Sequence, residues 1–271
     1  MDLKRTAGLR DELLRKIASR ATFRIADARG VRSGQVAVLG YPKSGTSWVA
    51  KLVSAALSLP EPSFYRAPIL KPAVLHGHVT DIQRVPVAYV VRDPRDVMTS
   101  LYHHRARVMK DNRSPRHNDQ MRERYACLPA PMNSDNYREN IHGFVEIEFS
   151  DPRDSRVPWD EHVRRALVMQ KSAGNLEIVR YEDMLVDSED SLEDLLVSLD
   201  FNPGRAMIAG AVETNSFEKL SGGRKAGEAD GSSFFRAGEA GRWRKEMPEE
   251  AAQAISERFF AEMELFHYGP A

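Results

Sequence analysis

The chain has 271 residues, of which 39 are lysine or arginine and 39 are aspartate or glutamate, so its formal net charge is zero. This balance does not suit a protein that coats nucleic acid or a polybasic membrane tether, so we expect no nucleic-acid partner, and any anion site must be local. The single cysteine, Cys127, excludes an internal disulfide framework, and no spacing of cysteine and histidine resembles a zinc site. A cytoplasmic location is therefore the expectation.

The first 30 residues are predicted to form a helical segment that precedes one domain at residues 31–271. Four apolar residues fall at helical spacing: Leu9, Leu13, Leu14 and Ile17. This spacing predicts a helix that docks against the core or against another subunit, such as a second copy in a homodimer. A basic membrane-surface helix is less favoured because acidic residues interrupt the charge. No apolar run approaches the ~20 residues that span a bilayer, so no transmembrane segment is expected.

The stretch from Val36 to Val49, VAVLGYPKSGTSWV, predicts a phosphate cradle. Its apolar beginning, Val36–Leu39, is typical of a buried parallel strand. Glycine, proline and serine follow as turn residues, and an apolar-periodic segment from Val49 to Leu57 predicts a helix. In a strand–loop–helix unit of this kind, loop amides and the helix N-terminus point at an anion, and the helix dipole favours negative charge.

The loop differs from the common nucleotide-binding version in the position of its lysine. Gly40 and Gly45 have the spacing of the Walker pattern, in which a lysine follows the second glycine. Thr46 occupies that position here, and Lys43 lies in the middle of the loop. A magnesium-triphosphate site is therefore not the first interpretation, and an anion site with its cation at another point is favoured.

The eight residues from Tyr41 to Trp48, YPKSGTSW, resemble the 5′-phosphosulfate-binding loop of the sulfotransferases that use 3′-phosphoadenosine 5′-phosphosulfate (PAPS). The resemblance covers about residues 35–245. It implies one α/β domain of the P-loop type, with a central parallel sheet flanked by helices. It also implies transfer of a sulfuryl group from PAPS to a hydroxyl or amine without a metal, because protein cations replace it. The residues implied at the 5′ end are Lys43, Ser44, Gly45, Thr46, Ser47 and Trp48. Lys43 would also offset charge on the bridging oxygen as the sulfuryl group leaves.

Two histidines follow the next predicted strand. Residues 58–74 contain four prolines, which predicts an irregular crossover that leads to a short strand at residues 74–75. His76 and His78 come next, at the carboxyl edge of the sheet where ligands bind in α/β folds. Histidine suits general-base chemistry at neutral pH.

In the family that the loop resembles, the base is the histidine of a Lys-Thr-His tripeptide between the first two phosphate motifs. His78 takes the position of that base, and His76 takes the position of the lysine. His76 would handle charge near the sulfate only if it were protonated. We favour His78 as the catalytic base over His76, and a purely structural role for His76 stays open.

A second phosphate motif follows the predicted strand at residues 87–91. Arg92 ends this strand, Asp93 is a good N-cap, and Pro94 suits the first position of a helix. Arginine offers a planar fork of donors to phosphate, and Ser100 adds a hydroxyl. The resemblance implies that Arg92 and Ser100 bind the 3′-phosphate of the nucleotide, although a motif of this kind on its own would also suit a capped helix start.

Residues 102–160 are basic and polar and contain several prolines, which predicts an irregular lid or binding loop. The resemblance implies that this region helps to form the acceptor pocket. Its basic residues would suit an anionic acceptor, but a charge run is more often a solvated face, so no substrate is indicated. His103 and His104 are expected at the surface or behind the catalytic residues.

Contacts with the adenine are implied further along the chain. A strand is predicted at residues 176–181, and Tyr181 resembles the tyrosine that contacts adenine in the family, although it would also suit a core edge. Ser216 and Phe217 resemble a short stretch that flanks the adenine, with Asn215 in place of the usual threonine. The remaining predicted helices span residues 159–169, 191–199 and 249–266.

A glycine-rich segment, residues 221–245, completes the predicted nucleotide site. It contains six glycines and six lysines or arginines without helical periodicity, which is typical of a flexible loop. The resemblance implies a motif that closes over the 3′-phosphate, formed by Arg236, Ala237, Gly238, Gly241 and Trp243. Ala237 replaces a lysine of the family, so one cationic contact is missing there, and Arg242 or Lys225 would compensate.

Two alternatives to a PAPS-dependent sulfotransferase stay open. One is a P-loop kinase or NTPase-like phosphotransferase, against which the displaced lysine argues. The other is a non-catalytic nucleotide-binding relative, in which His76 and Ala237 would mark lost function. The sequence does not indicate whether the acceptor is a small molecule, a lipid or a glycan.

The glycine-rich segment is predicted to be mobile without nucleotide and ordered with it. Adding 3′-phosphoadenosine 5′-phosphate (PAP) should slow amide hydrogen exchange across residues 221–245, because glycines let backbone amides approach the phosphate closely. Exchange followed by mass spectrometry with and without PAP measures this effect. Unchanged exchange would contradict the prediction.

Overall fold

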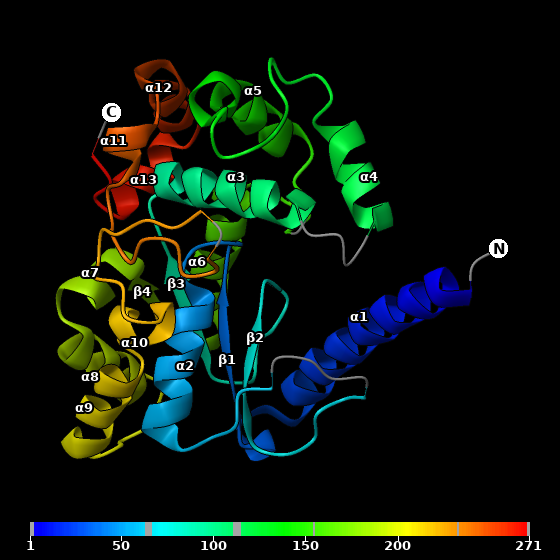
Figure 1. The fold of residues 1–271 in the computed structure, drawn as a ribbon. Coiled ribbons are helices and arrows are strands. Elements are labelled where there is room, and N and C mark those ends of the chain that lie inside the picture. The colour runs from blue at the N-terminus through cyan, green and yellow to red at the C-terminus, as the bar shows by residue number, and fades with distance from the viewer. Residues whose placement is uncertain (1–2, 63–66, 111–114, 154, 232, 270–271) are drawn as a thin grey trace.

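Four parallel strands form the centre of the protein in a computed structural model that describes residues 3–62, 67–110, 115–153, 155–231 and 233–269 (Figure 1). The strands are β1 (Gln35–Gly40), β2 (Ala73–Gly77), β3 (Val87–Val91) and β4 (Leu176–Arg180), in the order β2-β1-β3-β4. Every neighbouring pair is parallel, so the carboxyl ends of the strands meet at one edge of the sheet. This arrangement confirms the predicted α/β fold with a central parallel sheet.

The central strands β1 and β3 are buried along their whole length, as their unbroken apolar sequences predict. Alternate residues of β1 point to opposite faces of the sheet and enter two apolar clusters. Leu39 belongs to the cluster on one face, and Val38 belongs to the cluster on the other.

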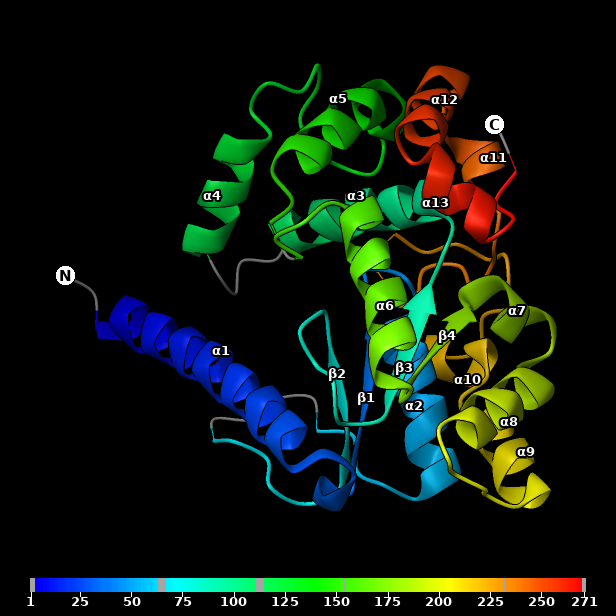
Figure 2. The same ribbon diagram turned by 180° about the vertical axis from the view of Figure 1, so that it is seen from behind.

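Helices cover both faces of the sheet (Figures 1 and 2). The cluster of Val38 includes residues of α2 (Thr46–Leu57), α8 (Ser188–Ser198) and α9 (Arg205–Thr214). The cluster of Leu39 includes residues of α3 (Pro94–Lys110), α5 (Tyr137–Ser150), α6 (Trp159–Ala173) and α12 (Glu249–Arg258). The shorter helices are η1 (Gly30–Ser33), α4 (Pro115–Arg124), α7 (Tyr181–Val186), α10 (Phe217–Ser221), α11 (Trp243–Glu246) and α13 (Phe260–Leu265).

The N-terminal helix α1 (Leu3–Arg29) lies against the domain through its C-terminal part. Phe23 is buried there, and the carboxylate of Asp27 accepts two backbone hydrogen bonds from the connection between β2 and β3. Both views show the rest of α1 extending away from the sheet, where Leu14 and Ile17 are about half exposed (Figures 1 and 2). The side chains of the other two apolar residues, Leu9 and Leu13, lie outside the described residues. Among the helices described, α1 included, none is both long and apolar enough to cross a bilayer.

The expectation of an irregular lid at residues 102–160 is wrong, because most of this region is helical. α3 continues to Lys110, and α4 and α5 follow, with Pro129 and Pro131 confined to the connection between them. α5 buries four apolar residues at helical spacing, namely Tyr137, Ile141, Phe144 and Val145. This periodic pattern was hidden among charged residues and prolines.

Three predicted boundaries also differ from the structure. β2 continues through His76 to Gly77, so His76 lies in the strand rather than past its end. Tyr181 is the first residue of α7 rather than the last residue of a strand. The predicted helix at residues 249–266 is divided at Phe259 into α12 and α13.

Replacing Gly40 by alanine should destabilise the protein. A Cβ at this position would lie 2.5 Å from the carbonyl oxygen of Val90 on the neighbouring strand, and backbone cannot move aside cheaply. We expect Gly40→Ala to lower the free energy of unfolding by about 1–3 kcal/mol, the usual cost of overpacking.

Denaturant titration measures this loss, and Gly210→Ala is the matched control. Gly210 lies inside α9, and a methyl group at this position would have no neighbouring atom within 4 Å, so its replacement should raise stability by about 1 kcal/mol through helix propensity. Equal stability of the two variants would contradict the packing described for β1 and β3.

Candidate active site

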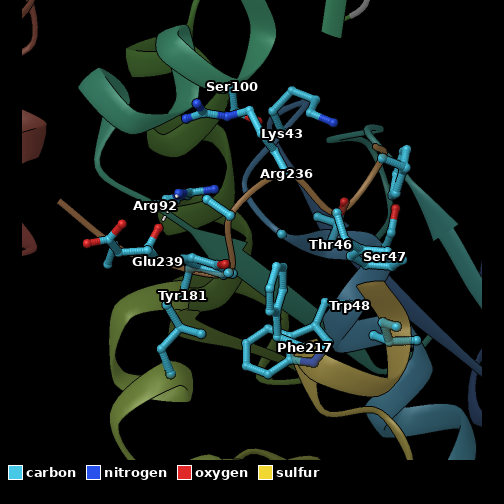
Figure 3. Close-up of a pocket in the computed structure, with 18 of the residues that line it drawn as sticks. Lys43, Thr46, Ser47, Trp48, Arg92, Ser100, Tyr181, Phe217, Arg236 and Glu239 are labelled. Atoms are coloured by element: carbon cyan, nitrogen blue, oxygen red, sulfur yellow. Dashed lines mark hydrogen bonds between the residues drawn. The ribbon is translucent and has the colours of Figure 1, made fainter. Parts of the chain in front are cut away.

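A cleft of about 650 Å³ opens at the carboxyl edge of the sheet (Figure 3). Its walls come from the loop between β1 and α2, the ends of β2 and β3, and the glycine-rich segment. The predicted site residues that line it are Lys43, Gly45, Thr46, Ser47, Trp48, His76, His78, Arg92, Ser100, Tyr181, Ser216, Phe217, Arg236, Ala237 and Gly238. Residues far apart in the sequence are thus brought to one place by the parallel topology.

The loop between β1 and α2 has the backbone of an anion cradle. Lys43 and Gly45 both adopt positive φ values, 72° and 94°, and α2 begins at Thr46. The first amides of a helix have no intrahelical acceptor, so those of Thr46 and Ser47 are available to an anion. A Cβ at Gly45 would overlap the ring of Tyr181, so only glycine fits this turn.

Ser44 differs from the other loop residues because its side chain does not line the cleft. It is fully buried, and its Oγ has no hydrogen-bond partner within the described part of the chain. The Nε of Arg92, at the other end of the cleft, is likewise buried without a partner among the described residues. A buried polar group without a partner is costly, and the Arg92 end of the cleft therefore suits a ligand that brings a hydrogen-bonding group.

The ammonium group of Lys43 lies 4.6 Å from the centre of the Phe234 ring. Burial lowers the pKa of Lys43 to about 8, and the positive charges of Arg107, Arg92, Arg105 and Arg236 contribute to this shift. Lys43 therefore lies where positive charge is concentrated and is not fully balanced. An anion in the cleft would restore the charged form of this side chain.

The two candidate histidines are held in different ways. The Nδ1 of His78 donates a hydrogen bond of 2.7 Å to the carbonyl oxygen of Gly40. A carbonyl only accepts, so in the neutral ring the lone pair of His78 lies on Nε2. The Nε2 of His76 instead forms a 2.8 Å hydrogen bond with the hydroxyl of Thr46. Burial lowers the pKa of His76 to about 4, and the nearby His78 contributes, so His76 is neutral at physiological pH.

His162 on α6 supports His78 and was missed in the sequence. Its Nε2 donates to the carbonyl oxygen of His78 at 3.1 Å, and its Nδ1 accepts from the hydroxyl of Tyr89 at 2.7 Å. Burial lowers the pKa of His162 to about 4, so the ring stays neutral and keeps this arrangement. The available signal was a histidine among the apolar residues of a predicted helix, beside Trp159 and Val163.

The predicted 3′-phosphate residues all line the cleft, and two of them, Ser100 and Arg236, lie beside Lys43 of the loop (Figure 3). The guanidinium of Arg92 stacks on Tyr181 at 4.2 Å and donates to the carbonyl oxygen of Glu239 at 3.2 Å. Ser100 lies on α3, and Arg236 forms an ion pair with Glu246 at 2.9 Å. Two arginines and a hydroxyl therefore face one end of the cleft.

The glycine-rich segment is attached to the start of α3 by two carboxylates. Asp96 accepts hydrogen bonds from the amides of Gly241 at 2.6 Å and Trp243 at 3.0 Å. Asp93 accepts from the indole of Trp243 at 3.2 Å and pairs with Arg95 at 2.7 Å. The roles of both carboxylates in holding this segment were not predicted, because their partners in it are 145 to 150 residues away.

The compensation predicted for the missing lysine at Ala237 is not what the structure shows. Arg242 forms ion pairs with Glu246 and Glu239, so two carboxylates already balance its charge. Lys225 does not line the cleft. Ala237 itself is buried against the cleft and contributes backbone.

Aromatic side chains form the remaining end of the cleft (Figure 3). The indole of Trp48 donates to the carbonyl oxygen of Asn215 at 2.9 Å and meets Tyr181 edge-on at 5.7 Å. Phe217 packs against Gly238, where any side chain would overlap the ring. A flat apolar group would fit among these rings. Within the described ranges, no three His, Cys, Asp or Glu side chains are grouped as a metal site would require.

The sulfotransferase domain family matches residues 70–267 of the chain. The chain belongs to this family. This sulfotransferase is therefore an enzyme of sulfuryl transfer, as the loop and the Arg92 motif predicted. The match begins after Trp48, so the assignment of the loop depends on its own residues and geometry.

Known sulfotransferases align over most of the chain. The enzyme is 23% identical to mouse Sulfotransferase 6B1 in an alignment of length 263 that covers 90% of this chain and 80% of the relative. It is 24% identical to human Sulfotransferase 2B1 in an alignment of length 225 that covers 72% of this chain and 54% of that protein.

Two solved structures share the fold. One is the mouse sulfotransferase SULT7A1 complexed with PAP, with a TM-score of 0.63 and 18% identity, covering 92% of this chain and 90% of that chain. The other is retinol dehydratase in complex with androsterone and PAP, with a TM-score of 0.58 and 21% identity. That match covers 89% of this chain and 85% of the retinol dehydratase chain.

The buried His162 should make the sulfotransferase sensitive to acid. Its pKa in the folded protein, about 4, lies below the ordinary 6.5, so the unfolded chain binds the proton first as the pH falls. Stability present above pH 6.5 should be lost between pH 6.5 and 4, by up to ~3 kcal/mol from this group. Urea titrations across this window should show a smaller loss in His162→Gln. The exposed His142→Gln variant is the control and should keep the wild-type loss, and a wild-type loss in His162→Gln would contradict the account.

Proposed function

We propose that the cleft binds PAPS and that His78 removes the proton of the acceptor hydroxyl. The observation that carries this proposal is the convergence in one cleft of the anion cradle, the cation Lys43 and a histidine whose Nε2 bears the lone pair. The structures that share the fold were solved with PAP, the nucleotide that remains after sulfuryl transfer, which supports PAPS as the donor.

The two ends of the cleft suit the two anionic ends of PAPS. Lys43 and the first amides of α2 would hold the 5′-phosphosulfate, and Arg92, Ser100 and Arg236 would hold the 3′-phosphate. The aromatic end, with Trp48, would take the adenine by stacking. The buried Nε of Arg92, which has no partner among the described residues, is consistent with a partner that arrives with such a ligand.

When bound, PAPS supplies the sulfuryl group. His78 Nε2 would accept the hydroxyl proton while the acceptor oxygen forms a bond to sulfur and the bond from sulfur to the bridging oxygen breaks. Lys43 would stabilise the negative charge that develops on that oxygen. The hydrogen bond from His78 to Gly40 would hold the neutral ring in the tautomer whose Nε2 accepts the proton, and the same bond remains when the ring becomes charged.

His76 suits a positioning role better than a catalytic one. Its hydrogen bond to Thr46 and its pKa of about 4 leave it neutral and occupied, so it cannot replace the cationic lysine of the family. It would instead fix the hydroxyl of Thr46 at the start of α2. The kinase alternative has no support in the family match.

The acceptor is proposed to be a small hydroxyl compound. Retinol dehydratase was solved with androsterone and with retinol, and the cleft of this enzyme adjoins exposed apolar surface at Phe234. A second copy of the chain as a partner through α1 remains a prediction.

Removing the imidazole of His78 tests the proposed base. We expect His78→Ala to lower kcat by roughly 10²–10⁴, because general-base catalysis contributes about that much, while PAP binds about as tightly as to wild type. His76→Gln should lose roughly tenfold or less, since the amide can still bond to Thr46. Turnover is measured with the hydroxyl compound that the wild-type enzyme sulfates fastest among a panel of such compounds. Full activity in His78→Ala would refute the assignment, and a larger loss in His76→Gln would transfer the role to His76.

The lowered pKa of Lys43 predicts a pH effect on nucleotide affinity. The side chain loses its proton as the pH rises through about 8, so the affinity for PAP should fall by up to ~tenfold between pH 7 and 9. Lys43→Arg should abolish the fall because arginine stays charged. Calorimetric titrations at both pH values decide this, and an equal fall in the variant would assign the effect to another group.

A further inference from the structure

Arg107 on α3 is a cation beside the cleft that the proposed nucleotide contacts do not include. Ser100, His104 and Arg107 follow one another at helical spacing and lie on one face of α3. Ser100 and His104 line the main cleft, and Arg107 lines a small recess that shares Lys43, Ser100, His104, Phe234 and Arg236 with it. The recess is therefore continuous with the catalytic cleft.

The backbone of Arg107 lies toward the acceptor side of the cleft. It is seven residues beyond Ser100, about 10 Å along a helix, and its side chain lines a recess that also includes Ser100 and Arg236. In both views the C-terminal half of α3 lies above the carboxyl end of β2 (Figures 1 and 2). His78, the proposed base, follows directly after β2. An acceptor hydroxyl at His78 would extend beneath this part of α3.

No carboxylate of the described residues balances the charge of Arg107, and Asp111, four residues further along, lies outside them. Arg92 has Asp96 at 3.6 Å and Arg236 has Glu246 at 2.9 Å. Within the described part of the chain, no aspartate or glutamate lies within ion-pair distance of Arg107. Its guanidinium donates instead to Nδ1 of His104 at 3.1 Å, which orients the arginine without neutralising it.

The lowered pKa of Lys43 indicates the same excess of positive charge. Burial is the largest cause of its lowered pKa, and Arg107 is the largest contributor among the charged neighbours, ahead of Arg92 and Arg236. Two cations, Lys43 and Arg107, thus approach each other with no carboxylate between them among the described residues. Such a pair is stabilised when an anion binds beside it.

We propose that the acceptor carries an anionic group, a carboxylate, sulfate or phosphate, in addition to its hydroxyl, and that Arg107 binds this group. The planar guanidinium fork matches two oxygens of such an anion, and His104 holds the fork in place. Arg107 is then a specificity-determining residue that selects hydroxy acids over neutral alcohols. This inference depends on the proposed function, because it assumes that the acceptor hydroxyl reaches His78.

Matched pairs of acceptors that differ only in charge test the inference. PAP-saturated enzyme is titrated with 4-hydroxyphenylacetate, 4-hydroxybutyrate and glucuronate, each beside its own amide. We expect at least one acid to bind about tenfold or more tightly than its neutral counterpart, the usual size of a charge-assisted contact. No preference for the acid in any pair would overturn the proposal.

Variants then assign the preference to Arg107. Arg107→Gln should remove the preference for the acid while the affinity for PAP stays within about twofold, and Arg107→Lys should keep part of it. Arg122→Gln, which alters an exposed arginine of α4, is the control and should keep the full preference. A tenfold loss of PAP affinity in Arg107→Gln would place this residue in the nucleotide site and overturn the inference. Failure of the wild type to bind PAP would instead refute the proposed function.

The wild-type pairs remain decisive if Arg107→Gln does not fold. The comparison of acid with amide needs no variant, and Arg107→Lys preserves the charge and the approximate size of the side chain. An acid preference that persists unchanged in Arg107→Lys and Arg107→Gln would assign the anion site to other residues and contradict the proposal.

Discussion

The carboxylate of Asp96 connects the two halves of the cleft. Its side chain is 1% exposed, so it needs partners, and it obtains them from Arg92 at 3.6 Å and from the amides of Gly241 and Trp243. The end of the sheet and the glycine-rich segment are thereby attached to the same buried charge. Moving the glycine-rich segment away would remove two hydrogen bonds from this buried carboxylate, which is costly. The segment therefore stays in place, and Arg236 stays at the cleft.

The cations of the cleft fall into two groups with different functions. Arg92 and Arg236 are held by carboxylates, and Glu246 stays ionised for Arg236 because its contacts with His103, Arg236 and Arg242 outweigh burial and lower its pKa to about 2. Lys43 has no such carboxylate among the described residues, and its pKa falls to about 8. Paired arginines provide fixed geometry, whereas an unpaired lysine provides charge that responds to the ligand.

The sequence predicted those parts of the structure that depend on local pattern. The loop from Tyr41 to Trp48, the strand that ends at Val91 and the start of α3 at Pro94 are each determined by a few neighbouring residues. The contact of His162 with His78 spans 84 residues, and no local signal records it. The helices within residues 102–160 were missed because their apolar residues are separated by charged ones and by prolines.

The most direct test of a two-ended anion site is calorimetric titration with PAP, ADP and ATP in the absence of magnesium. We predict that PAP binds more tightly than ADP or ATP, because Arg92, Ser100 and Arg236, which line the cleft, are proposed to bind the 3′-phosphate that the other two nucleotides lack. Arg92→Gln should reduce this preference. Equal or tighter binding of ATP would contradict the account, since it would mean that these three residues do not form a 3′-phosphate site.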